Sequence, residues 1–256
     1  MRDRYGPWAV VAGASEGIGA AFARALCDKG LDVVLVARRP QPLASLAAAL
    51  PGRTMTVAAD LSTVDGLDAV FTATDGLDVG LVVHNAAYSP IGPLTTLDPA
   101  DTARALDLNC RAPLRLAHRY LPPMVARGRG GFVVMSSLAG QQGSPGLAAY
   151  AATKAFGAVL AEGLWGELRG TGVDVLTCVA GAVATPGLGR AMAKPAPGTV
   201  TPDEVVRAAL GALGRRPRTV PGGLMRVSAA VMSRVLPRRT AIVTMGRASK
   251  DLSPPN

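Results

Sequence analysis

The sequence has few of the residues from which metal sites and disulfide frameworks are built. Its 256 residues include two histidines and three cysteines. His84 and His118 lie far apart, and Cys27, Cys110 and Cys178 lie in apolar periodic segments without metal-ligand spacing. We therefore predict no metal site, and reduced core cysteines of the kind found in cytoplasmic proteins.

Long hydrophobic runs are also missing. No apolar stretch approaches the ~18 residues that a membrane span requires. The N-terminal residues show no secretory leader and move directly into a strand-like segment. Both features predict a cytoplasmic protein.

Acidic residues are scarce in the last quarter of the chain. Residues 190–256 contain twelve Lys and Arg but three Asp and Glu, whereas residues 1–189 contain fifteen of each, so this quarter carries the net charge of +9. A basic segment can meet nucleic acid, an anionic membrane surface or an acidic substrate, or be an arginine-rich surface without a partner. No aromatic residue interrupts it, which argues against single-stranded nucleic acid. We predict no nucleic-acid partner.

Alternating strand and helix patterns are what the sequence does contain. Short apolar runs, typical of strands buried on both faces, occur at residues 8–12, 32–37, 54–58, 80–84, 131–135 and 172–178. A helical pattern follows nearly every run. This alternation predicts one α/β domain over residues 1–256, with a doubly wound, mostly parallel sheet of about seven strands between two helical layers.

Further expectations concern individual elements. We expect separate helices at 98–110 and 112–126, the second kinked or shortened by Pro122 and Pro123. Near the C-terminus the pattern predicts a helix around 223–236 and a short strand at 241–244.

A glycine-rich turn joins the first strand to the first long helix. Gly13, Gly17 and Gly19, with Ser15 and Ile18 between them, allow a tight turn in which backbone amides approach a pyrophosphate. The helix N-terminus adds partial positive charge at the same place. The loop therefore predicts a dinucleotide site.

The second strand ends in Arg38 and Arg39. An NAD site usually offers an acidic residue here, whereas arginine matches a 2′-phosphate. The pair predicts NADP(H); the alternative is that both residues merely begin the next helix in solvent.

Two further strand ends complete the candidate cofactor site. Asp60, followed by Leu61, can accept a hydrogen bond from an adenine amino group or can cap a helix that opens at Ser62. Asn85 and Ala86 follow the fourth strand, where small residues let a ribose pack against the backbone.

The candidate catalytic residues are Ser137, Tyr150 and Lys154. Tyr150 and Lys154 stand four residues apart on a predicted helix, hence on one face. The Lys154 ammonium is expected to lower the pKa of the Tyr150 phenol towards neutrality. Ser137, just past the fifth strand, can hydrogen-bond the oxygen of a carbonyl or alkoxide beside the phenol. Ser137 is chosen over Ser136 because neighbours on a strand point to opposite sides.

Taken together, these motifs resemble the short-chain dehydrogenase/reductase family, in its shorter single-domain branch, over residues 7–213. The resemblance implies a Rossmann-type fold and NADP(H) as cofactor. It also implies a catalytic tetrad of Asn109, Ser137, Tyr150 and Lys154, with Tyr150 as acid and Asn109 holding a water that links Lys154 to solvent. Val183 and Thr185 would lie near the nicotinamide, and Tyr150 and Lys154 would also contact the cofactor.

The sequence departs from the family pattern at two places. His84 stands where the family's Asn-Asn-Ala-Gly motif begins, and we expect it to be a tolerated strand-end residue. Ala180 replaces a proline, which we expect to loosen the following loop.

The predicted function is NADPH-dependent interconversion of a ketone or aldehyde and its alcohol. Apolar walls favour a 3-oxoacyl or polyketide-like, or a steroid or xenobiotic-like, substrate; the alternative is a catalytically silent NADP-binding protein. We expect residues 187–200 to form a substrate loop and 214–256 a basic extension. The extension can contact a membrane or a second subunit, and the resemblance, which implies a homodimer or homotetramer, favours the subunit.

Overall fold

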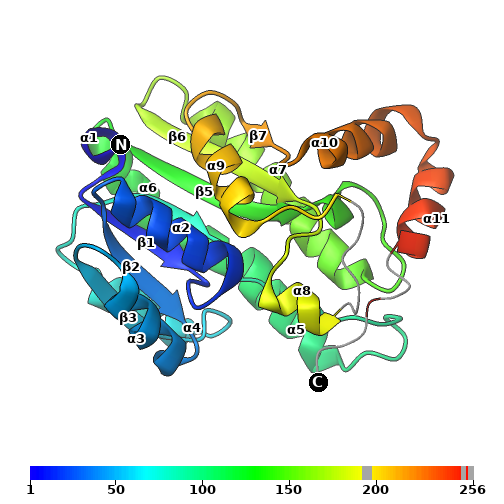
Figure 1. The fold of residues 1–256 in the computed structure, drawn as a ribbon, viewed down its shortest axis with the longest axis horizontal. Coiled ribbons are helices and arrows are strands. Elements are labelled where there is room, and N and C mark those ends of the chain that lie inside the picture. Colours follow the sequence, from blue (N-terminus) through cyan, green and yellow to red (C-terminus); the bar gives the residue numbers. More distant parts are fainter. Residues whose placement is uncertain (192–197, 249–251, 253–256) are drawn as a thin grey trace.

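The computed structural model describes residues 1–191, 198–248 and 252. Its centre is a seven-stranded sheet in the order β3-β2-β1-β4-β5-β6-β7, with every neighbouring pair parallel (Figure 1). The strands are β1 (Trp8–Ala12), β2 (Asp32–Ala37), β3 (Thr54–Ala58), β4 (Val79–His84), β5 (Gly130–Ser137), β6 (Val173–Ala180) and β7 (Arg218–Thr219). The predicted doubly wound parallel sheet is confirmed.

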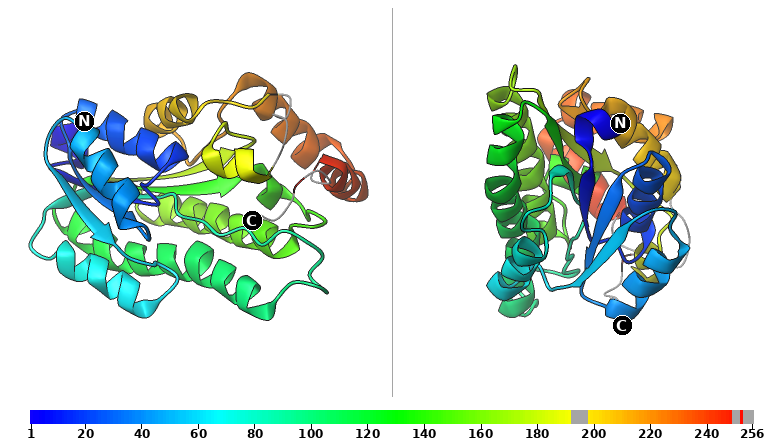
Figure 2. Two further views of the ribbon diagram at one scale, coloured as in Figure 1. Left: turned by 60° about the horizontal axis from the view of Figure 1, so that its bottom comes forward. Right: turned by 90° about the vertical axis from the view of Figure 1, so that its left-hand side faces the viewer.

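Helices cover both faces of the sheet (Figure 2). One face carries α2 (Gly17–Asp28), α3 (Pro40–Ala49) and α9 (Pro202–Ala212). The other carries α4 (Val64–Ala73), α6 (Ala112–Ala126) and α7 (Ala148–Glu167). The remaining helical segments are α1 (Arg2–Tyr5), α5 (Pro99–Leu106), η1 (Asp107–Arg111), η2 (Leu138–Gln141), α8 (Pro186–Ala191), α10 (Gly223–Ala230), η3 (Val231–Val235) and α11 (Arg238–Ala248).

Alternation along the central strands divides the core into two. In β1, Ala9 and Val11 face the layer of α2, α3 and α9, whereas Val10 and Ala12 face that of α4, α6 and α7. All four side chains are fully buried. Because β1 is buried on both faces, its sequence is apolar at every position and does not alternate between apolar and polar residues.

The strand order reverses direction between β1 and β4. The chain first winds outward through β2 and β3, then returns to β4 and continues through β5 to β7. In such a sheet a crevice opens beyond the carboxyl ends of the strands on either side of the reversal. The loops that follow β1, β4 and β5 therefore lie beside one another.

Two predicted helices form one continuous helical run. α5, the π-helical η1 and α6 follow without an interruption from Pro99 to Ala126, so the predicted break after Cys110 is wrong. The expectation that the proline pair ends the helix early is also wrong, because α6 continues past Pro122 and Pro123 to Ala126.

The predicted strand at 241–244 is wrong as well. These residues lie inside α11, where Ala241 is fully buried. The seventh strand is instead β7, whose two residues are too few to show a period in the sequence. Within the predicted substrate loop 187–200, residues 192–197 lie outside the described residues.

Candidate active site

The glycine-rich turn is held against the end of β4. Gly13 and Gly17 have φ angles of 81° and 58°, which favour glycine. A Cβ on Gly13 would lie 2.7 Å from the amide nitrogen of Ala86, and one on Gly19 would lie 1.9 Å from the carbonyl oxygen of Gly13. The absence of side chains is thus required by the close approach of the two loops.

Three of the segments predicted to bind cofactor meet at this turn. Asn85 donates a hydrogen bond from Nδ2 to the Gly13 oxygen at 3.0 Å. A Cβ on Gly17 would lie 2.9 Å from Cγ2 of Thr185. Val183 is buried and forms a bridge to Val200, which fixes the segment that carries Thr185. Ile18 packs against the core and Ser15 is partly exposed.

The two arginines after β2 have different surroundings. Arg39 forms an ion pair with Glu16 at 3.0 Å, and Glu16 is also paired with Arg190. Arg38 is exposed and, among the described residues, has neither a hydrogen bond nor an ion pair. Its charge acts on Asp60 and Tyr88, so its guanidinium lies near the carboxyl ends of β2 and β3.

Asp60 already uses both carboxylate oxygens. Oδ1 accepts hydrogen bonds from the amide and hydroxyl of Ser62, and Oδ2 forms an ion pair with Arg104 at 2.8 Å. Burial opposes ionisation, but these bonds and the charges of Arg104 and Arg38 hold the pKa of Asp60 below its ordinary value. The expected cap at Ser62 is wrong, because α4 begins at Val64 and Thr63 is its N-cap. The Leu61 side chain is buried.

The catalytic candidates lie where β5 ends and α7 begins. Ser137 is the last residue of β5, while Tyr150 and Lys154 lie in the first two turns of α7. The Lys154 Nζ lies 5.6 Å from the centroid of the Tyr150 ring. Tyr150 also forms a side-chain hydrogen bond with Ser137. The structure therefore brings the three side chains together.

Ser136 has a different role from its neighbour. Its buried hydroxyl donates to the backbone oxygen of Lys154 at 2.7 Å, which ties β5 to α7. The Ser137 hydroxyl lies on the other side of the strand and accepts a hydrogen bond from the amide of Ala139 at 3.2 Å. The alternation predicted from the sequence separates these roles.

Burial determines the acidities of the pair. It raises the pKa of Tyr150 above its ordinary value, and the Ser137 hydrogen bond only partly offsets this. The expected lowering of the Tyr150 pKa is therefore wrong for this structure. Burial likewise lowers the pKa of Lys154 to about 8, because its ammonium is removed from water; its Nζ donates to the Met135 oxygen at 3.0 Å.

Asn109 lies in the π-helical segment η1 and is buried. Its Nδ2 donates to the backbone oxygen of Tyr88 and to the Thr153 hydroxyl, at 2.8 and 2.9 Å, while its Oδ1 accepts from the Tyr88 amide at 2.9 Å. The sequence analysis missed Thr153. It lies one residue before Lys154, a position from which it links Asn109 to α7.

His84 is buried at the end of β4. Burial and, to a lesser extent, the nearby charge of Lys154 lower its pKa to about 3, although a backbone hydrogen bond at Leu108 acts in the opposite direction. The imidazole is therefore neutral. Among the described residues its Nε2 has no hydrogen-bond partner. His84 is the last residue of β4, as expected, and its complete burial beside a buried lysine was not predicted from the sequence.

Ala180, the residue in place of the family's proline, is the last residue of β6. It is buried and pairs in register with Ser137. The backbone at this position is therefore restrained by the sheet.

A pocket of about 340 Å³ lies between the segment after β4, the segment before α7 and the C-terminal part of the chain. It is lined by Ile91, Gly92, Pro93, Pro145, Gly146, Gly246 and Leu252. Residues 91–93 and 145–146 belong to two of the apolar walls expected around the substrate, at 88–94 and 138–147, and Gly246 brings α11 against them. The lining is uncharged, as suits an apolar ligand.

The surroundings fit a dinucleotide. The glycine turn provides a surface that any side chain would obstruct, and it lies at the N-terminus of the twelve-residue helix α2. Arg38 provides an unpaired guanidinium at one end, and the Ser137–Tyr150–Lys154 group lies at the other. Over residues 1–191, 198–248 and 252, no group of His, Cys, Asp and Glu is arranged to hold a metal ion.

Comparison with known proteins agrees with this geometry. The family model of short chain dehydrogenase matches residues 7–195. A 7β-hydroxysteroid dehydrogenase of Clostridium sardiniense is 36% identical over 190 residues, which cover 73% of either chain. A very-long-chain 3-oxoacyl-CoA reductase of Anas platyrhynchos is 29% identical over 256 residues, covering 96% of this chain and 81% of the reductase.

Solved structures show the same relation. A structure from a study of 7β-hydroxysteroid dehydrogenase stereoselectivity has a TM-score of 0.90 and 30% identity, covering 96% of this chain and 99% of its own. A short-chain dehydrogenase from Sphingobium yanoikuyae in complex with NADPH has a TM-score of 0.76 and 30% identity, covering 90% and 96%. The chain belongs to the short-chain dehydrogenase family. It is accordingly an oxidoreductase that interconverts alcohols and carbonyl compounds.

Proposed function

We propose that the protein is an NADPH-dependent carbonyl reductase, or the reverse alcohol dehydrogenase, in which Tyr150 is the acid and base. The observation that supports this best is the meeting of Ser137, Tyr150 and Lys154 where β5 ends and α7 begins. These three side chains each suit a different part of carbonyl reduction. They lie at the same edge of the sheet as the glycine turn, which fits a dinucleotide. A silent binding protein has no need of that arrangement.

The residues act as follows in the proposed reduction. A bound nicotinamide would supply the hydride that reduces the carbonyl carbon. The Tyr150 hydroxyl would donate its proton to the carbonyl oxygen. The raised pKa of Tyr150 keeps the phenol protonated at neutral pH, which is the form that a reductase needs. Ser137 donates a hydrogen bond to the same oxygen, which orients the carbonyl and stabilises developing negative charge.

Lys154 and Asn109 support the proton transfer. The buried ammonium of Lys154 lies against the Tyr150 ring and favours the phenolate as it forms. Asn109 and Thr153 connect η1 to the turn of α7 that carries this lysine. We propose that a water held at Asn109 links Lys154 to solvent.

Arg38 supports NADP(H) over NAD(H). Among the described residues it forms no ion pair, whereas Arg39 is paired with Glu16. A guanidinium binds a 2′-phosphate through charge-assisted, often bidentate hydrogen bonds. Gly13 to Gly19, Asn85 and Ala86 would hold the pyrophosphate and ribose, and Val183 and Thr185 would lie near the nicotinamide.

An apolar ketone is the best substrate class. The uncharged lining of the 340 Å³ pocket supports it, because Pro145 and Gly146 of that lining lie a few residues before Tyr150. The similarity to 7β-hydroxysteroid dehydrogenases and 3-oxoacyl-CoA reductases points to a bulky steroid-like or long acyl substrate. Residues 187–200 are the proposed substrate loop.

A cofactor-oxidation assay tests the proposal. The purified protein is mixed with NADPH, or separately NADH, and the loss of nicotinamide absorbance is followed with steroid ketones, aliphatic ketones, aldehydes and 3-oxoacyl thioesters. We expect turnover with NADPH and a preference for the bulky ketones. Tight NADPH binding without turnover of any class would favour the silent protein, and failure to bind either nucleotide would overturn the cofactor site.

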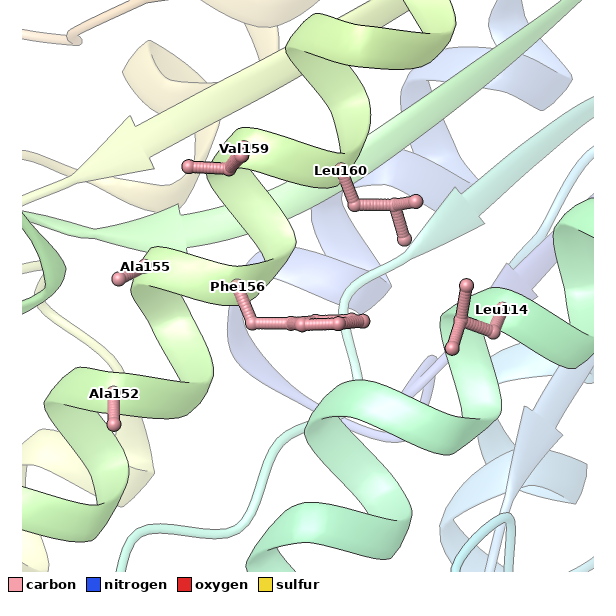
Figure 3. Close-up of a pocket in the computed structure, with 6 residues that line it drawn as sticks. All are labelled: Leu114, Ala152, Ala155, Phe156, Val159 and Leu160. Atoms are coloured by element: carbon pink, nitrogen blue, oxygen red, sulfur yellow. The ribbon is translucent and has the colours of Figure 1, made fainter.

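We also propose that the chain forms a homo-oligomer through the outer faces of α6 and α7. A shallow groove of about 490 Å³ lies there, lined by Leu114, Ala152, Ala155, Phe156, Val159 and Leu160 (Figure 3). Val159 is 68% exposed and Phe156 37%. The six lining residues carry no charge, so a second copy related by a twofold axis would bury them without placing like charges together.

A further inference from the structure

The C-terminal helices carry an apolar stripe that is exposed over the part of the chain that the structure describes. Leu224, Val227, Val231 and Val235 are 56%, 61%, 38% and 71% exposed. Their spacing of three, four and four residues places them along one side of α10 and η3. Isolated exposed valines are common on proteins, but four in one line on adjacent turns form a continuous surface.

The opposite side of the same helix is packed on the protein. Ala229 is buried, and Met225 is so close to the strand end that a Cβ on Gly181 would lie 2.7 Å from its sulfur. Leu138, which follows the catalytic serine, also borders Gly181. The helix is therefore fixed in rotation, and its apolar stripe points away from the core.

Arginines lie on the same C-terminal helices as the stripe. Arg226 and Arg234 lie on α10 and η3, and Arg239 and Arg247 lie on α11; all four are exposed. Among the described residues none of the four has an acidic partner. The sequence contains no Asp or Glu from Arg215 to Lys250. The ionisable side chains of α10, η3 and α11 are therefore all cationic.

This charge pattern distinguishes between possible partners. A twofold contact with a second copy would bring arginine against arginine with no carboxylate between them, which costs binding free energy. The uncharged groove on α6 and α7 has no such penalty. An anionic bilayer instead offers phosphate groups to the arginines and hydrocarbon to the valines and Leu224.

The surface also adjoins the proposed substrate pocket. Gly246 of α11 lines that pocket, and a Cβ on Gly143 would lie 3.7 Å from Ile242. Arg238 donates to the backbone oxygen of Gln141 at 2.9 Å. In Figures 1 and 2, α10 and α11 project together beyond one end of the sheet. A surface resting on a bilayer there would hold the pocket mouth near molecules dissolved in the membrane.

We propose that α10, η3 and α11 form a peripheral binding surface for anionic lipid bilayers. Leu224, Val227, Val231 and Val235 enter the interface between headgroups and acyl chains, while the arginines contact lipid phosphates. Over the part of the chain that the structure describes, no helix meets the length and hydropathy needed for a bilayer span.

Vesicle sedimentation with the full chain tests this proposal. One set of vesicles contains phosphatidylcholine and phosphatidylglycerol, and the other contains phosphatidylcholine alone. We expect the protein to pellet with the anionic vesicles at low ionic strength and to be released at about 0.5 M salt, where the Debye length falls to about 4 Å. Equal pelleting with neutral vesicles, or none with anionic ones, would overturn the proposal.

Matched variants locate the surface. Arg226→Gln with Arg234→Gln should weaken partitioning about 25-fold, since each cation near the headgroups contributes about fivefold. Arg24→Gln with Arg207→Gln, two exposed arginines on α2 and α9, should change it by less than about twofold. If the control pair also weakens partitioning 25-fold, net charge alone drives binding and the proposed surface is not its site.

A second pair tests insertion. Val235→Asp should abolish pelleting, whereas Val64→Asp, an equally polar change at an exposed valine of α4, should not. If Val235→Asp instead reduces the molar mass in solution and wild type does not pellet, the stripe is a subunit contact and the proposal fails. Binding does not depend on the reaction: Tyr150→Phe should pellet as wild type does, whatever its activity.

Discussion

A buried lysine and a partly buried tyrosine share one face of α7, and each is shifted towards its neutral form. The pKa of Lys154 falls to about 8 and that of Tyr150 rises, in both cases because burial removes the charged form from water. A phenol that stays protonated suits reduction, and a lysine that titrates near pH 8 suits resupply of the proton.

Replacing Tyr150 by Phe removes the proton donor and leaves the ring that packs against Lys154. We expect turnover to fall by about 10²–10⁴-fold, the usual contribution of a positioned acid, while NADPH affinity changes by less than about threefold. Steady-state rates and fluorescence titration measure the two. Tyr120→Phe is the matched control, because Tyr120 is buried beside Thr74 and distant in sequence and contact from the site. Turnover retained in Tyr150→Phe would remove the proposed role.

Replacing Arg38 by Asp should exchange the cofactor preference. The unpaired guanidinium is lost, and a carboxylate that repels a 2′-phosphate but accepts hydrogen bonds from ribose hydroxyls takes its place. We expect the ratio of NADPH to NADH affinity to fall by about 10–100-fold, as for a lost charged hydrogen bond. Isothermal titration with both nucleotides measures it, with Arg24→Asp as a control of equal charge change. An unchanged ratio would mean that Arg38 does not contact the phosphate.

His84 gives the fold a pH dependence of its own. Its folded pKa of about 3 lies below the ordinary value of 6.5, so the unfolded chain binds the proton first as the pH falls. The stability that the neutral imidazole contributes is complete above about pH 6.5 and is lost progressively towards pH 3. Between about pH 7 and pH 4.5 the loss amounts to about 3 kcal/mol.

His84→Asn removes this titration. Urea unfolding of both proteins at several pH values should show the wild type losing about 3 kcal/mol more than the variant over that range. Equal pH dependence of the two would contradict the buried, neutral histidine. The choice of asparagine keeps a polar side chain at the end of β4.

The residue-level predictions that succeeded depended on spacing, and those that failed depended on environment. Alternation along a strand correctly separated Ser137 from Ser136, and the four-residue spacing correctly placed Tyr150 beside Lys154. The direction of the Tyr150 pKa was wrong, because burial depends on what packs around the phenol. The catalytic roles themselves stay predictions.

At the scale of elements, the sequence was informative where a period or a turn requires particular residues. β1, the glycine turn and α2 were predictable because a buried strand and a close approach each restrict the residue type. The strand expected at 241–244 was not, since the β-branched residues there also suit a helix packed through Ala241. The π-helical η1 was not predicted, because one widened turn of five residues is too short to show a period of its own in the sequence.

Gly19 and Gly163 provide an element-scale test, because each is a helical glycine with negative φ. In α2, a Cβ on Gly19 would lie 1.9 Å from the Gly13 oxygen, whereas in α7 nothing lies within 4 Å of a Cβ on Gly163. Gly19→Ala should therefore cost about 1–3 kcal/mol and weaken NADPH binding, and Gly163→Ala should gain about 0.5–1 kcal/mol from helix propensity. Thermal and urea unfolding measure both. A neutral Gly19→Ala would show that the turn has room for a side chain.

At the scale of the molecule, six strands and their order along the chain were predictable from the sequence. It was also predictable that the motifs lie at the carboxyl ends of these strands. The order in which strands pair did not, because pairing is decided by how β4 returns beside β1. Surface function was equally hidden. Composition revealed a basic C-terminal quarter, but which side of α10 faces outward, and which face of α7 is uncharged, required the packed structure.

We propose different partners for the two exposed apolar surfaces: a second copy for the groove of α6 and α7, and a lipid bilayer for the stripe on α10 and η3. One substitution distinguishes them. Val159 lies on the uncharged groove of α7 and is 68% exposed. If a second copy covers it, Val159→Asp places two carboxylates at the centre of a twofold contact. Their desolvation and mutual repulsion would destabilise the dimer. We expect light scattering after size exclusion to show an oligomer for wild type and a lower molar mass for the variant.

Val64→Asp on α4 is the control, since it makes the same change at an exposed valine outside the groove. It should leave the molar mass unchanged. Vesicle pelleting by Val159→Asp should remain, because the lipid surface belongs to α10, η3 and α11. A wild type that is monomeric at every concentration would refute the oligomer. If Val159→Asp loses both vesicle pelleting and molar mass, lipid binding requires the assembled form.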